Sequence, residues 1–397
     1  MNASGYPLGK TGRLDGALTA VLLITLLFWV SYTCRAIMGP LLVHMEKGLN
    51  LDHVQATSLF LFLSTGFSLG LFSSGFITAK VTPRNVMIFS VSAGGGMLLC
   101  IAQSQTLWQA RIFFGLLGII AGTYLPAALA ALSSLVKPRN WSRAVAIHEM
   151  SPPLSFIVSP LVAETLAAKY GWQSAMIVLG CLSILMGLVF FLVGKGGRET
   201  TEKPSISGIA EVLRCPIFWV FIWLFGLAVG GEFAPYSVLP LSLTVEQGLS
   251  STEASQLLSL SRVASPFTAL LGGWAVSRMG VVRALLLFLV IHGLSLVAMA
   301  LPVSTIGHGG MFAAMSVQAM SSAFSFAPLF ALLAESFPLG RQTLVLSLSL
   351  PVAIYAGNGI VPLLFGFCGE YLSFSAGYLM LGLLCIVTVP ALVFCKK

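Results

Sequence analysis

The stretch Gly194-Lys-Gly-Gly-Arg-Glu-Thr-Thr-Glu-Lys-Pro-Ser-Ile-Ser-Gly208 is the only sustained polar segment in a chain of 397 residues. Its glycine, serine, threonine and charged side chains are typical of a solvated linker. Long apolar segments lie on both sides of it. The sequence therefore predicts two domains, residues 1–194 and 211–397, joined by a linker at residues 195–210.

The apolar segments have the length of membrane-spanning helices. Hydrophobic residues make up 57% of the chain, charged residues make up only 9%, and the mean hydropathy is +0.95. A helix that crosses the hydrocarbon core needs about 20 apolar residues, whereas soluble domains carry far more charge. We expect an all-α polytopic membrane protein with two pseudo-symmetric bundles of six helices each. The predicted helices are 15–43, 54–79, 84–103, 107–134, 143–167, 172–194, 216–243, 254–276, 282–301, 309–334, 342–367 and 371–395.

Basic residues gather on one predicted side of the membrane. If both termini are cytoplasmic, only Lys47 and Lys169 lie in outer loops, while Arg35, Arg111 and Arg262 lie within predicted helices. Cytoplasmic loops are enriched in lysine and arginine, so this distribution favours cytoplasmic termini. We expect a multi-pass protein of the cell membrane, with the bacterial inner membrane as its site. The net charge of +8 reflects this bias, so nucleic acid is not an expected partner.

The sequence contains no pattern typical of an enzyme or a metal site. Its seven cysteines lie in or beside apolar segments without paired spacing, and its five histidines form no ligand cluster. A nucleotide-binding loop of the GxxxxGK[ST] type is also missing. We therefore expect no cofactor, no metal and no enzymatic activity, and any energy for transport would come from a gradient.

Two loops repeat at corresponding places in the predicted halves. The loop after the second helix reads Gly75-Phe-Ile-Thr-Ala-Lys-Val-Thr-Pro-Arg84, and the loop after the eighth reads Gly273-Trp-Ala-Val-Ser-Arg-Met-Gly-Val-Val-Arg283. Such a repeat is typical of transporters built from two parallel halves. The residues that we assign to this conformational motif are Gly75, Lys80, Arg84, Gly273, Arg278, Gly280 and Arg283.

Over its full length the chain resembles the major facilitator superfamily. Both loops are similar to the family signature G-x-L-A-D-R-x-G-R-R/K, with Ala79 and Ser277 at the position of the aspartate. The segment Leu107-Trp-Gln-Ala-Arg111-Ile-Phe-Phe-Gly115-Leu-Leu-Gly118 resembles a second signature, L-x-x-x-R-x-x-x-G-x-x-G. The resemblance implies a secondary transporter that works as a monomer, with Arg111 and Gly115 in its conformational motif.

Two intramembrane arginines are the strongest candidates for a binding site. Arg35 and Arg262 each lie about eight residues from the outer end of a predicted helix, roughly 12 Å below the surface. A guanidinium stays charged in hydrocarbon at a high cost, and it binds carboxylate or phosphate groups through two hydrogen bonds. We therefore predict that the pair binds a small anion between the halves. Further candidate substrate contacts are Tyr32, Tyr236, Tyr355 and Asn358.

Three titratable residues are candidates for proton coupling. Glu149 and Glu232 are acids within predicted helices, and His148 precedes Glu149 near a pair of prolines. Glu232 could carry a proton, neutralise an arginine or contact the substrate, and His148 could be a relay or a packing residue. The glycines and the proline of residues 230–236 permit a bent or unwound helix there. Glu164 and Glu335 lie nearer the ends of helices, where we expect them to face water.

A weaker local resemblance concerns the organophosphate:phosphate antiporters of the superfamily. Those proteins also place a histidine in the fifth helix, and the stretch Tyr32-Thr-Cys-Arg35 looks like their first helix. They supply a second arginine from the seventh helix, where this chain has Glu232, so sugar-phosphate specificity does not carry over.

The sequence thus predicts a secondary transporter that moves a small organic anion by alternating access. The anion would be a carboxylate, a phosphate ester or a sulfonate, carried by exchange or together with protons. Two alternatives remain open: a proton-coupled exporter of drugs or other metabolites, and a membrane sensor that binds a ligand without moving it.

Overall fold

The computed structural model describes residues 17–202 and 208–394, which fold into helices with no strand among them. The N-terminal half contains α1 Leu18–Ala36, α2 Met38–Leu49, α3 His53–Thr78, α4 Pro83–Ala102, α5 Leu107–Gly122, α6 Tyr124–Leu135, η1 Pro138–Asn140, α7 Trp141–His148, α8 Ser151–Tyr170 and α9 Trp172–Val193. The C-terminal half contains α10 Ile209–Leu213, α11 Pro216–Val245, α12 Ser251–Ser261, α13 Ser265–Met279, α14 Val281–Met299, α15 Val303–Ser336, α16 Leu339–Tyr355, η2 Ala356–Ile360, α17 Val361–Tyr371 and α18 Phe374–Phe394.

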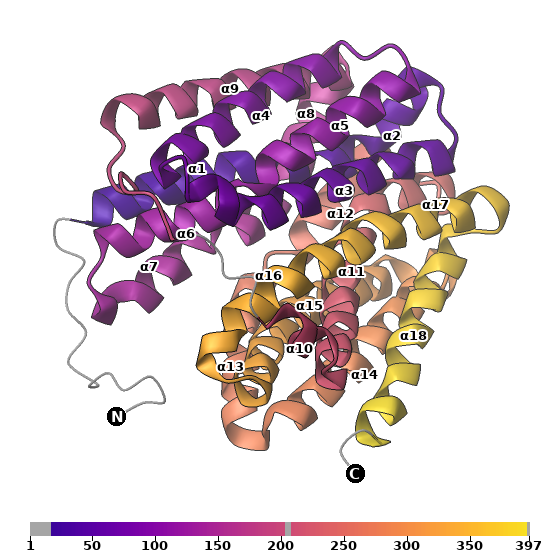
Figure 1. Cartoon of the computed structure of the whole chain (residues 1–397). Coiled ribbons are helices and arrows are strands. Elements are labelled where there is room, and N and C mark those ends of the chain that lie inside the picture. The colour runs from indigo at the N-terminus through magenta and orange to yellow at the C-terminus, as the bar shows by residue number, and fades with distance from the viewer. Residues whose placement is uncertain (1–16, 203–207, 395–397) are drawn as a thin grey trace.

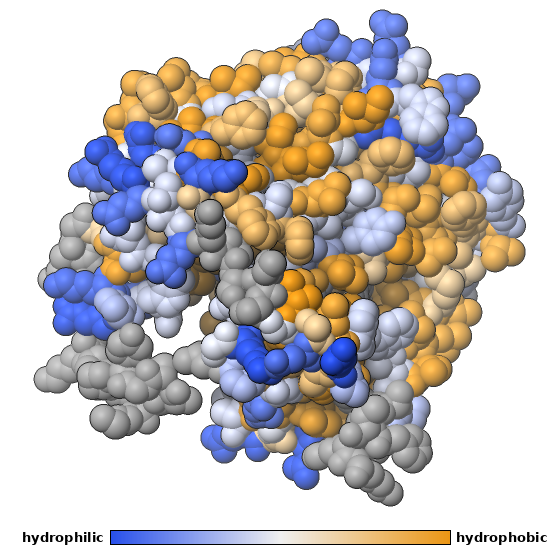
Figure 2. All heavy atoms as spheres, in the orientation of Figure 1, coloured by the Kyte–Doolittle hydropathy of each residue, from blue (hydrophilic) through white to orange (hydrophobic). Residues whose placement is uncertain are grey.

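Helices occur at all twelve predicted positions, and ten helical segments of the described chain are long and apolar enough to cross a membrane. The predicted eighth helix differs because the turn 262–264 divides it into α12 and α13. The predicted twelfth is the single helix α18, Phe374–Phe394. The face shown in Figure 2 is apolar across its middle, with hydrophilic residues toward its two ends.

Several predicted helix boundaries were wrong because they were placed near charged or polar residues. Such a residue marks contact with water rather than the end of a helix. The first helix was predicted to end at residue 43, but α2 continues to Leu49 and ends where Asn50 adopts a left-handed conformation with φ 51°. The fifth was predicted to begin at residue 143, whereas helical structure begins at Pro138. Arg35 lies near the end of α1, and α2 continues the chain to Leu49. Arg35 is therefore farther from the outer end of this helical segment than predicted.

Local sequence explains where several helices begin. Asp52, Thr106 and Ser250 each form a capping box, in which the side chain accepts a hydrogen bond from the backbone N–H three residues later. This bond satisfies an N–H group that has no partner within the helix. Gly280 precedes α14 with φ 83°, a conformation that glycine adopts without steric strain.

Prolines interrupt the helices that cross the middle of the molecule. A proline has no N–H, so the carbonyl four residues before it loses its helical hydrogen bond. Pro40, Pro126, Pro152 and Pro266 lie four residues after Ala36, Gly122, His148 and Arg262, where α1, α5, α7 and α12 end. Pro362 lies four residues after Asn358, which is in the π turn η2. Residues 230–236, which the sequence allows to be bent or unwound, are not unwound, because α11 is one continuous helix there.

Close packing of α3 against α5 depends on glycine. A Cβ atom added to Gly118 would overlap with the carbonyl oxygen of Leu63, and one added to Gly66 would overlap with that of Gly115. Small residues allow helix backbones to approach this closely within a membrane. At Gly115 itself an added Cβ would be 3.7 Å from the carbonyl oxygen of Phe62, an ordinary contact.

The two halves contact each other mainly at one end, which we call the outer end after the predicted orientation; it contains Leu49, Tyr170 and Val245. There α2 packs on α11, α8 on α12, and α3 on α17, while α3 also packs on α16 nearer the middle. The halves diverge toward α7 and α13 (Figure 1), and the surface is hollowed between them on that side (Figure 2). The structure is therefore closed at the outer end.

The linker is bound to the N-terminal half. The backbone N–H of Arg84 donates to Gly197 O at 2.9 Å, and Gly197 N–H donates to Ser134 Oγ at 3.0 Å. Thr201 Oγ1 donates to Thr78 Oγ1 at 2.9 Å. This part of the linker therefore moves with the N-terminal half, and α10 begins within the last residues of the predicted linker range.

Candidate functional site

Arg262 lies at the interruption between α12 and α13 and is almost completely buried, with an exposed fraction of 2%. Its Nη2 donates to Gln318 Oε1 at 3.3 Å, and Gln318 Nε2 donates to Gly231 O at 2.6 Å. The guanidinium also lies over the rings of Tyr236 and Phe156, with Cζ at 5.4 and 5.8 Å from their centroids. Gln318 therefore fixes one edge of the guanidinium.

Arg35 lies at the corresponding interruption between α1 and α2. Its Cζ is 4.7 Å from the ring centroid of Tyr32 and 4.4 Å from that of Phe67. Such cation–π contacts stabilise a cation in a place with little water. No described residue forms an ion pair with Arg35.

Aromatic rings connect the two arginines across the halves. Phe156 of α8 contacts Tyr32 of α1 with ring centroids 5.4 Å apart, and Tyr236 of α11 with centroids 4.5 Å apart. The arginines lie at the two ends of this row of rings. Phe156 belongs to the N-terminal half but contacts Arg262 of the C-terminal half, a role that sequence reasoning missed because no pattern distinguishes this phenylalanine.

Polar atoms with no partner collect around the row of rings. Among the described residues, the buried Nε atoms of Arg35 and Arg262 and the hydroxyl of Tyr236 have no hydrogen-bond partner. Ser159 lies near the Tyr236 hydroxyl, but neither hydroxyl makes a hydrogen bond of adequate geometry. Buried donors are normally satisfied, and leaving one unpaired costs about 1–3 kcal/mol. Two guanidinium N–H groups and a phenol are suited to binding an anion.

Glu232 lies near this site but forms no ion pair with a described residue. It lies on α11 between Gly231 and Phe233, close enough to Arg262 for their charges to interact. Among the described residues, no ion pair or hydrogen bond joins its carboxylate to either arginine. Its three predicted roles remain predictions.

His148 and Glu149 form a pair at the interruption between α7 and α8. His148 Nδ1 is 3.0 Å from Glu149 Oε1, and the imidazole is fully buried, stacked on Phe28 with ring centroids 4.3 Å apart. Its Nε2 has no partner among the described residues. The Glu149 side chain is 43% exposed. The two predicted roles of His148, as a relay or as a packing residue, remain predictions.

Asn358 and Tyr355 lie farther along the interface between the halves. Asn358 is part of η2, and its Oδ1 is buried without a partner among the described residues. Tyr355 lines an almost entirely apolar cavity of about 430 Å³ between α3, α11 and α16, which also includes Ser68 and Trp219. No described contact joins Tyr355 to either arginine, so the structure does not bring it to the same site.

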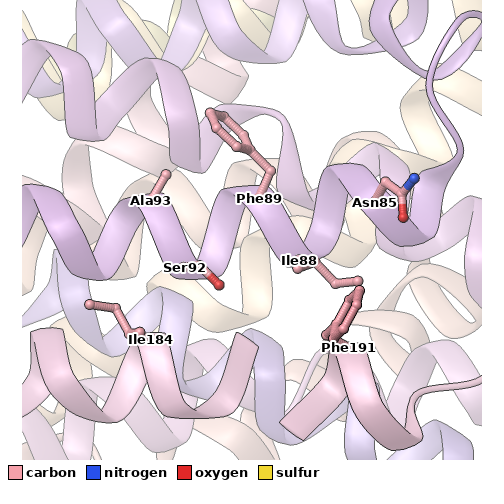
Figure 3. A pocket seen from close by; sticks show the side chains of 7 residues that line it. All are labelled: Asn85, Ile88, Phe89, Ser92, Ala93, Ile184 and Phe191. Carbon is pink, nitrogen blue, oxygen red and sulfur yellow. The ribbon is translucent and has the colours of Figure 1, made fainter. Parts of the chain in front are cut away.

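A second cavity lies between α4 and α9 and is separate from both arginines. Its volume is about 590 Å³, and Figure 3 shows Phe89 and Phe191 beside it. Both phenylalanines are more than half exposed, and the lining contains no charged residue. This cavity is part of the apolar outer surface.

The residues of the predicted conformational motif have varied surroundings. Arg84 Nη2 donates to Phe191 O at 2.6 Å, and Arg111 Nε donates to Ser58 Oγ at 3.0 Å. A Cβ atom added to Gly273 would meet nothing within 4 Å. The remaining members lie at the surface or at a turn: Lys80, Arg278 and Arg283 are exposed, Gly75 is partly buried, and Gly280 is the positive-φ residue before α14.

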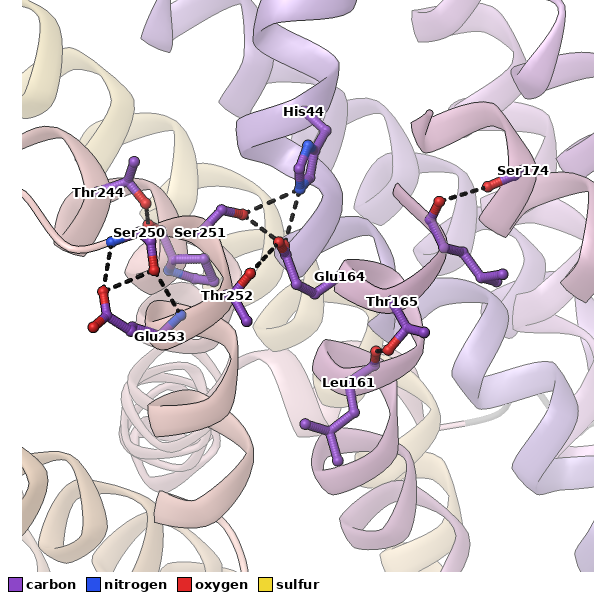
Figure 4. Close-up of polar contacts among 12 residues, drawn as sticks. His44, Leu161, Glu164, Thr165, Ser174, Thr244, Ser250, Ser251, Thr252 and Glu253 are labelled. Atoms are coloured by element: carbon purple, nitrogen blue, oxygen red, sulfur yellow. Dashed lines mark hydrogen bonds and ion pairs between the residues drawn. The ribbon is translucent and has the colours of Figure 1, made fainter. Parts of the chain in front are cut away.

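Sequence reasoning missed a polar cluster at the outer end. Glu164 was expected to face water, but it is 7% exposed and binds across the halves (Figure 4). Ser251 Oγ donates to its Oε2 at 2.6 Å, and Thr252 Oγ1 donates to its Oε1 at 2.9 Å. His44 Nε2 is 3.0 Å from Oε2. These residues are far apart in sequence, so neither periodicity nor spacing indicated the cluster.

Comparison with known proteins identifies the family. A sequence profile described as the Major Facilitator Superfamily matches residues 24–349 and 226–396. The chain belongs to this superfamily. The predicted resemblance and the all-α membrane fold are thereby confirmed, and the protein is a multi-pass membrane transporter.

Members of the superfamily with known names or structures show how distant the relationships are. The "Probable nitrate/nitrite transporter NarK2" of Mycobacterium tuberculosis is 21% identical over 269 residues, which are 67% of this chain and 68% of that protein. A variant of the nucleoside transporter NupG has a TM-score of 0.80 at 14% identity over 95% of this chain and 100% of that one. A bacterial homologue of the human lysosomal transporter Spinster has a TM-score of 0.77 at 14% identity over 96% of both chains. These structures show the shared fold.

Proposed function

We propose that this transporter carries a small anion, which Arg35 and Arg262 bind from opposite halves. The observation that supports the proposal best is the set of buried donors without partners, two guanidinium Nε atoms and the Tyr236 hydroxyl. Carboxylates, phosphate esters and sulfonates all offer acceptors with suitable geometry. The relative NarK2, named as a nitrate/nitrite transporter, adds small inorganic anions to the candidates.

Alternating access follows from the charges of the two arginines. When the site is empty, bringing two guanidinium groups into a closed cavity is opposed by their repulsion and by the loss of water. A bound anion offsets both costs, so the occupied protein changes conformation more readily than the empty one. This behaviour favours exchange. One chain contributes both arginines, so a monomer would suffice.

Proton coupling would give the same site a second mode of transport, proton symport in place of exchange. Protonation of Glu232 or of the His148–Glu149 pair changes the net charge near the arginines by one unit. If that proton moves with the anion, the transporter works as a proton symporter. Transport measured with and without a proton gradient, in the chain and in Glu232→Gln, separates the two modes.

The proposal is tested by uptake into proteoliposomes. The substrates are radiolabelled mono- and dicarboxylates, phosphate esters, sulfonates and nitrate, and the variant is Arg262→Gln. We expect saturable uptake of one anion class, reduced at least about a hundredfold by the substitution, because two charge-assisted hydrogen bonds are lost. Arg198→Gln, at an exposed position, is the matched control. Uptake that survives in Arg262→Gln would assign the arginine a structural role.

The apolar cavity between α3, α11 and α16 favours one other candidate function. It opens between the two halves and is lined by Phe72, Phe218 and Trp219. An exporter of apolar drugs or metabolites would use such a cavity. It would carry neutral or cationic compounds, and it would tolerate neutralisation of Arg35 and Arg262.

A further inference from the structure

The Glu164 cluster contains a buried acid whose one basic partner among the described residues is a histidine. No described lysine or arginine lies within ion-pair distance of the carboxylate, while His44 Nε2 lies 3.0 Å away. The other two partners are hydroxyl groups of Ser251 and Thr252, which donate to it. His44 adds a third donor when its Nε2 carries a proton. This arrangement suits the deprotonated acid.

These hydrogen bonds form only when the outer end is closed. Glu164 is on α8 of the N-terminal half, and Ser251 and Thr252 are in the first turn of α12 of the C-terminal half. The first turn of a helix favours negative charge, because its N–H groups have no helical partner. Figure 4 shows the carboxylate between His44 and this first turn. Separation of α8 from α12 would remove two of its three donors and expose it to water.

The neighbouring elements present few other charges. On α12, Glu253 accepts hydrogen bonds from Ser250 instead. On α2, Glu46 binds His53, and Lys47 is exposed. The remaining charges face elsewhere: Lys169 of α8 lies over Tyr170, Arg35 of α1 lies over Tyr32 and Phe67, and α9 contains no acidic, basic or histidine residue.

We propose that Glu164 is a proton-binding site of the outer gate, which binds a proton more tightly when the gate is open than when it is closed. Protonation replaces an ionised acceptor with an O–H, so the charge-assisted hydrogen bonds from Ser251 and Thr252 become weaker. Closure therefore favours release of the proton. External acid favours the open state, since the state with fewer donors binds the proton more tightly.

Protonation of His44 would shift the gate in the opposite direction to protonation of Glu164, which makes the proposal testable. A protonated His44 would bind the Glu164 carboxylate more strongly and hold the gate closed. If His44 dominated, acid would close the outer end. If Glu164 dominates, acid opens it. One proton changes the ratio of open to closed molecules by at most about tenfold per pH unit.

The experiment measures a distance rather than transport, so it does not depend on which substrate is carried. Spin labels are attached at Tyr170→Cys and Thr305→Cys, both exposed at the outer ends of different halves, in the full chain without its native cysteines. Double electron–electron resonance in lipid nanodiscs at pH 4 and pH 8 gives the open fraction. We expect the open-to-closed ratio to rise about threefold from pH 8 to pH 4, since a water-exposed glutamate begins to bind protons only near pH 4–5.

Variants assign the response to one residue. In Glu164→Gln the open fraction should be high and independent of pH, whereas His44→Gln should keep a response of the same sign. Glu335→Gln, an exposed acid at the other end of the molecule, is the matched control. Thr252→Val keeps the acid but removes a donor, so its open fraction at pH 8 should increase. No change with pH, a change of opposite sign, or an unaltered response in Glu164→Gln would overturn the proposal.

Discussion

The two arginines differ from ordinary buried charges because no described residue forms an ion pair with either of them. Each guanidinium lies on aromatic rings, a contact worth about 2 kcal/mol when water is excluded. This contact holds the cation in place without using its N–H groups. The Nε donors therefore have no partner among the described residues and are available to a ligand.

At the scale of single residues, we predict that Gln318→Leu weakens substrate binding. Gln318 is buried with an exposed fraction of 1% and is the hydrogen-bond partner that orients Arg262. Its loss frees the guanidinium to turn and leaves Gly231 O without a donor. We expect KM for the anion to rise about tenfold with a smaller change in maximal rate, since a hydrogen bond to a charged group contributes about 1.5–3 kcal/mol.

Initial uptake rates over a range of concentrations measure this effect. Gln103→Leu, at an exposed position, is the control and should transport like the parent protein. An unchanged KM in Gln318→Leu would show that Arg262 keeps its orientation without the amide.

The sequence identified the two arginines and the tyrosines that lie against them, Tyr32 and Tyr236, but not the role of Phe156. Arg35 and Arg262 stood out because a charge within an apolar segment is rare. Phe156 and Gln318 look like any aromatic or amide residue, and they contact Arg262 from other helices. Glu164 was misjudged for a related reason, because its donors lie on the other half of the molecule.

At the scale of helices, each interruption near the site has a chemical cause in the sequence. A proline four residues downstream leaves a carbonyl without its donor, and both candidate arginines lie beside such a position. The positions of the helices were predictable from the lengths of apolar segments. The interruptions were not predicted, because hydropathy is averaged over a window and does not register one missing hydrogen bond.

We predict that Pro266→Ala makes the protein more stable and less active. Arg262 O now accepts hydrogen bonds from the backbone N–H and the hydroxyl of Ser265, at 3.2 and 2.8 Å. Alanine restores an N–H that can replace these donors, which would join α12 and α13 into one helix. Proline is about 3 kcal/mol less favourable than alanine within a helix. The melting temperature in detergent should rise by several degrees, and the uptake rate should fall because the guanidinium is displaced.

Thermal unfolding and uptake of the same preparations test the idea together. Pro302→Ala, at an exposed position before α15, should change neither quantity appreciably. A Pro266→Ala protein with parental stability and parental uptake would mean that the interruption does not depend on the proline.

At the scale of the whole molecule, the contacts between halves are concentrated at the outer end. The Glu164 cluster and the hydrogen bond from His53 N–H to Glu370 Oε2, 3.0 Å long, join α8 to α12 and α3 to α17. Breaking these contacts is the main step needed to open that end. The description of this end as outer depends on the predicted orientation.

We predict that the orientation places Lys169 outside the cell and Lys137 inside. Both side chains are exposed, and they lie at opposite ends of helical segments in the N-terminal half. A maleimide that cannot cross membranes should label Lys169→Cys in intact right-side-out vesicles. It should label Lys137→Cys only after the vesicles are permeabilised. The reverse pattern would place both termini outside.

The ring of Phe156 lies between tyrosines from different halves, so it lies where the two halves meet. Any rocking of one half against the other must change its distance from Tyr236 and Arg262. A tryptophan at this position would therefore sense the state of the transporter through the colour and intensity of its fluorescence. The protein thus contains, beside its binding site, a position from which its working cycle can be followed by light.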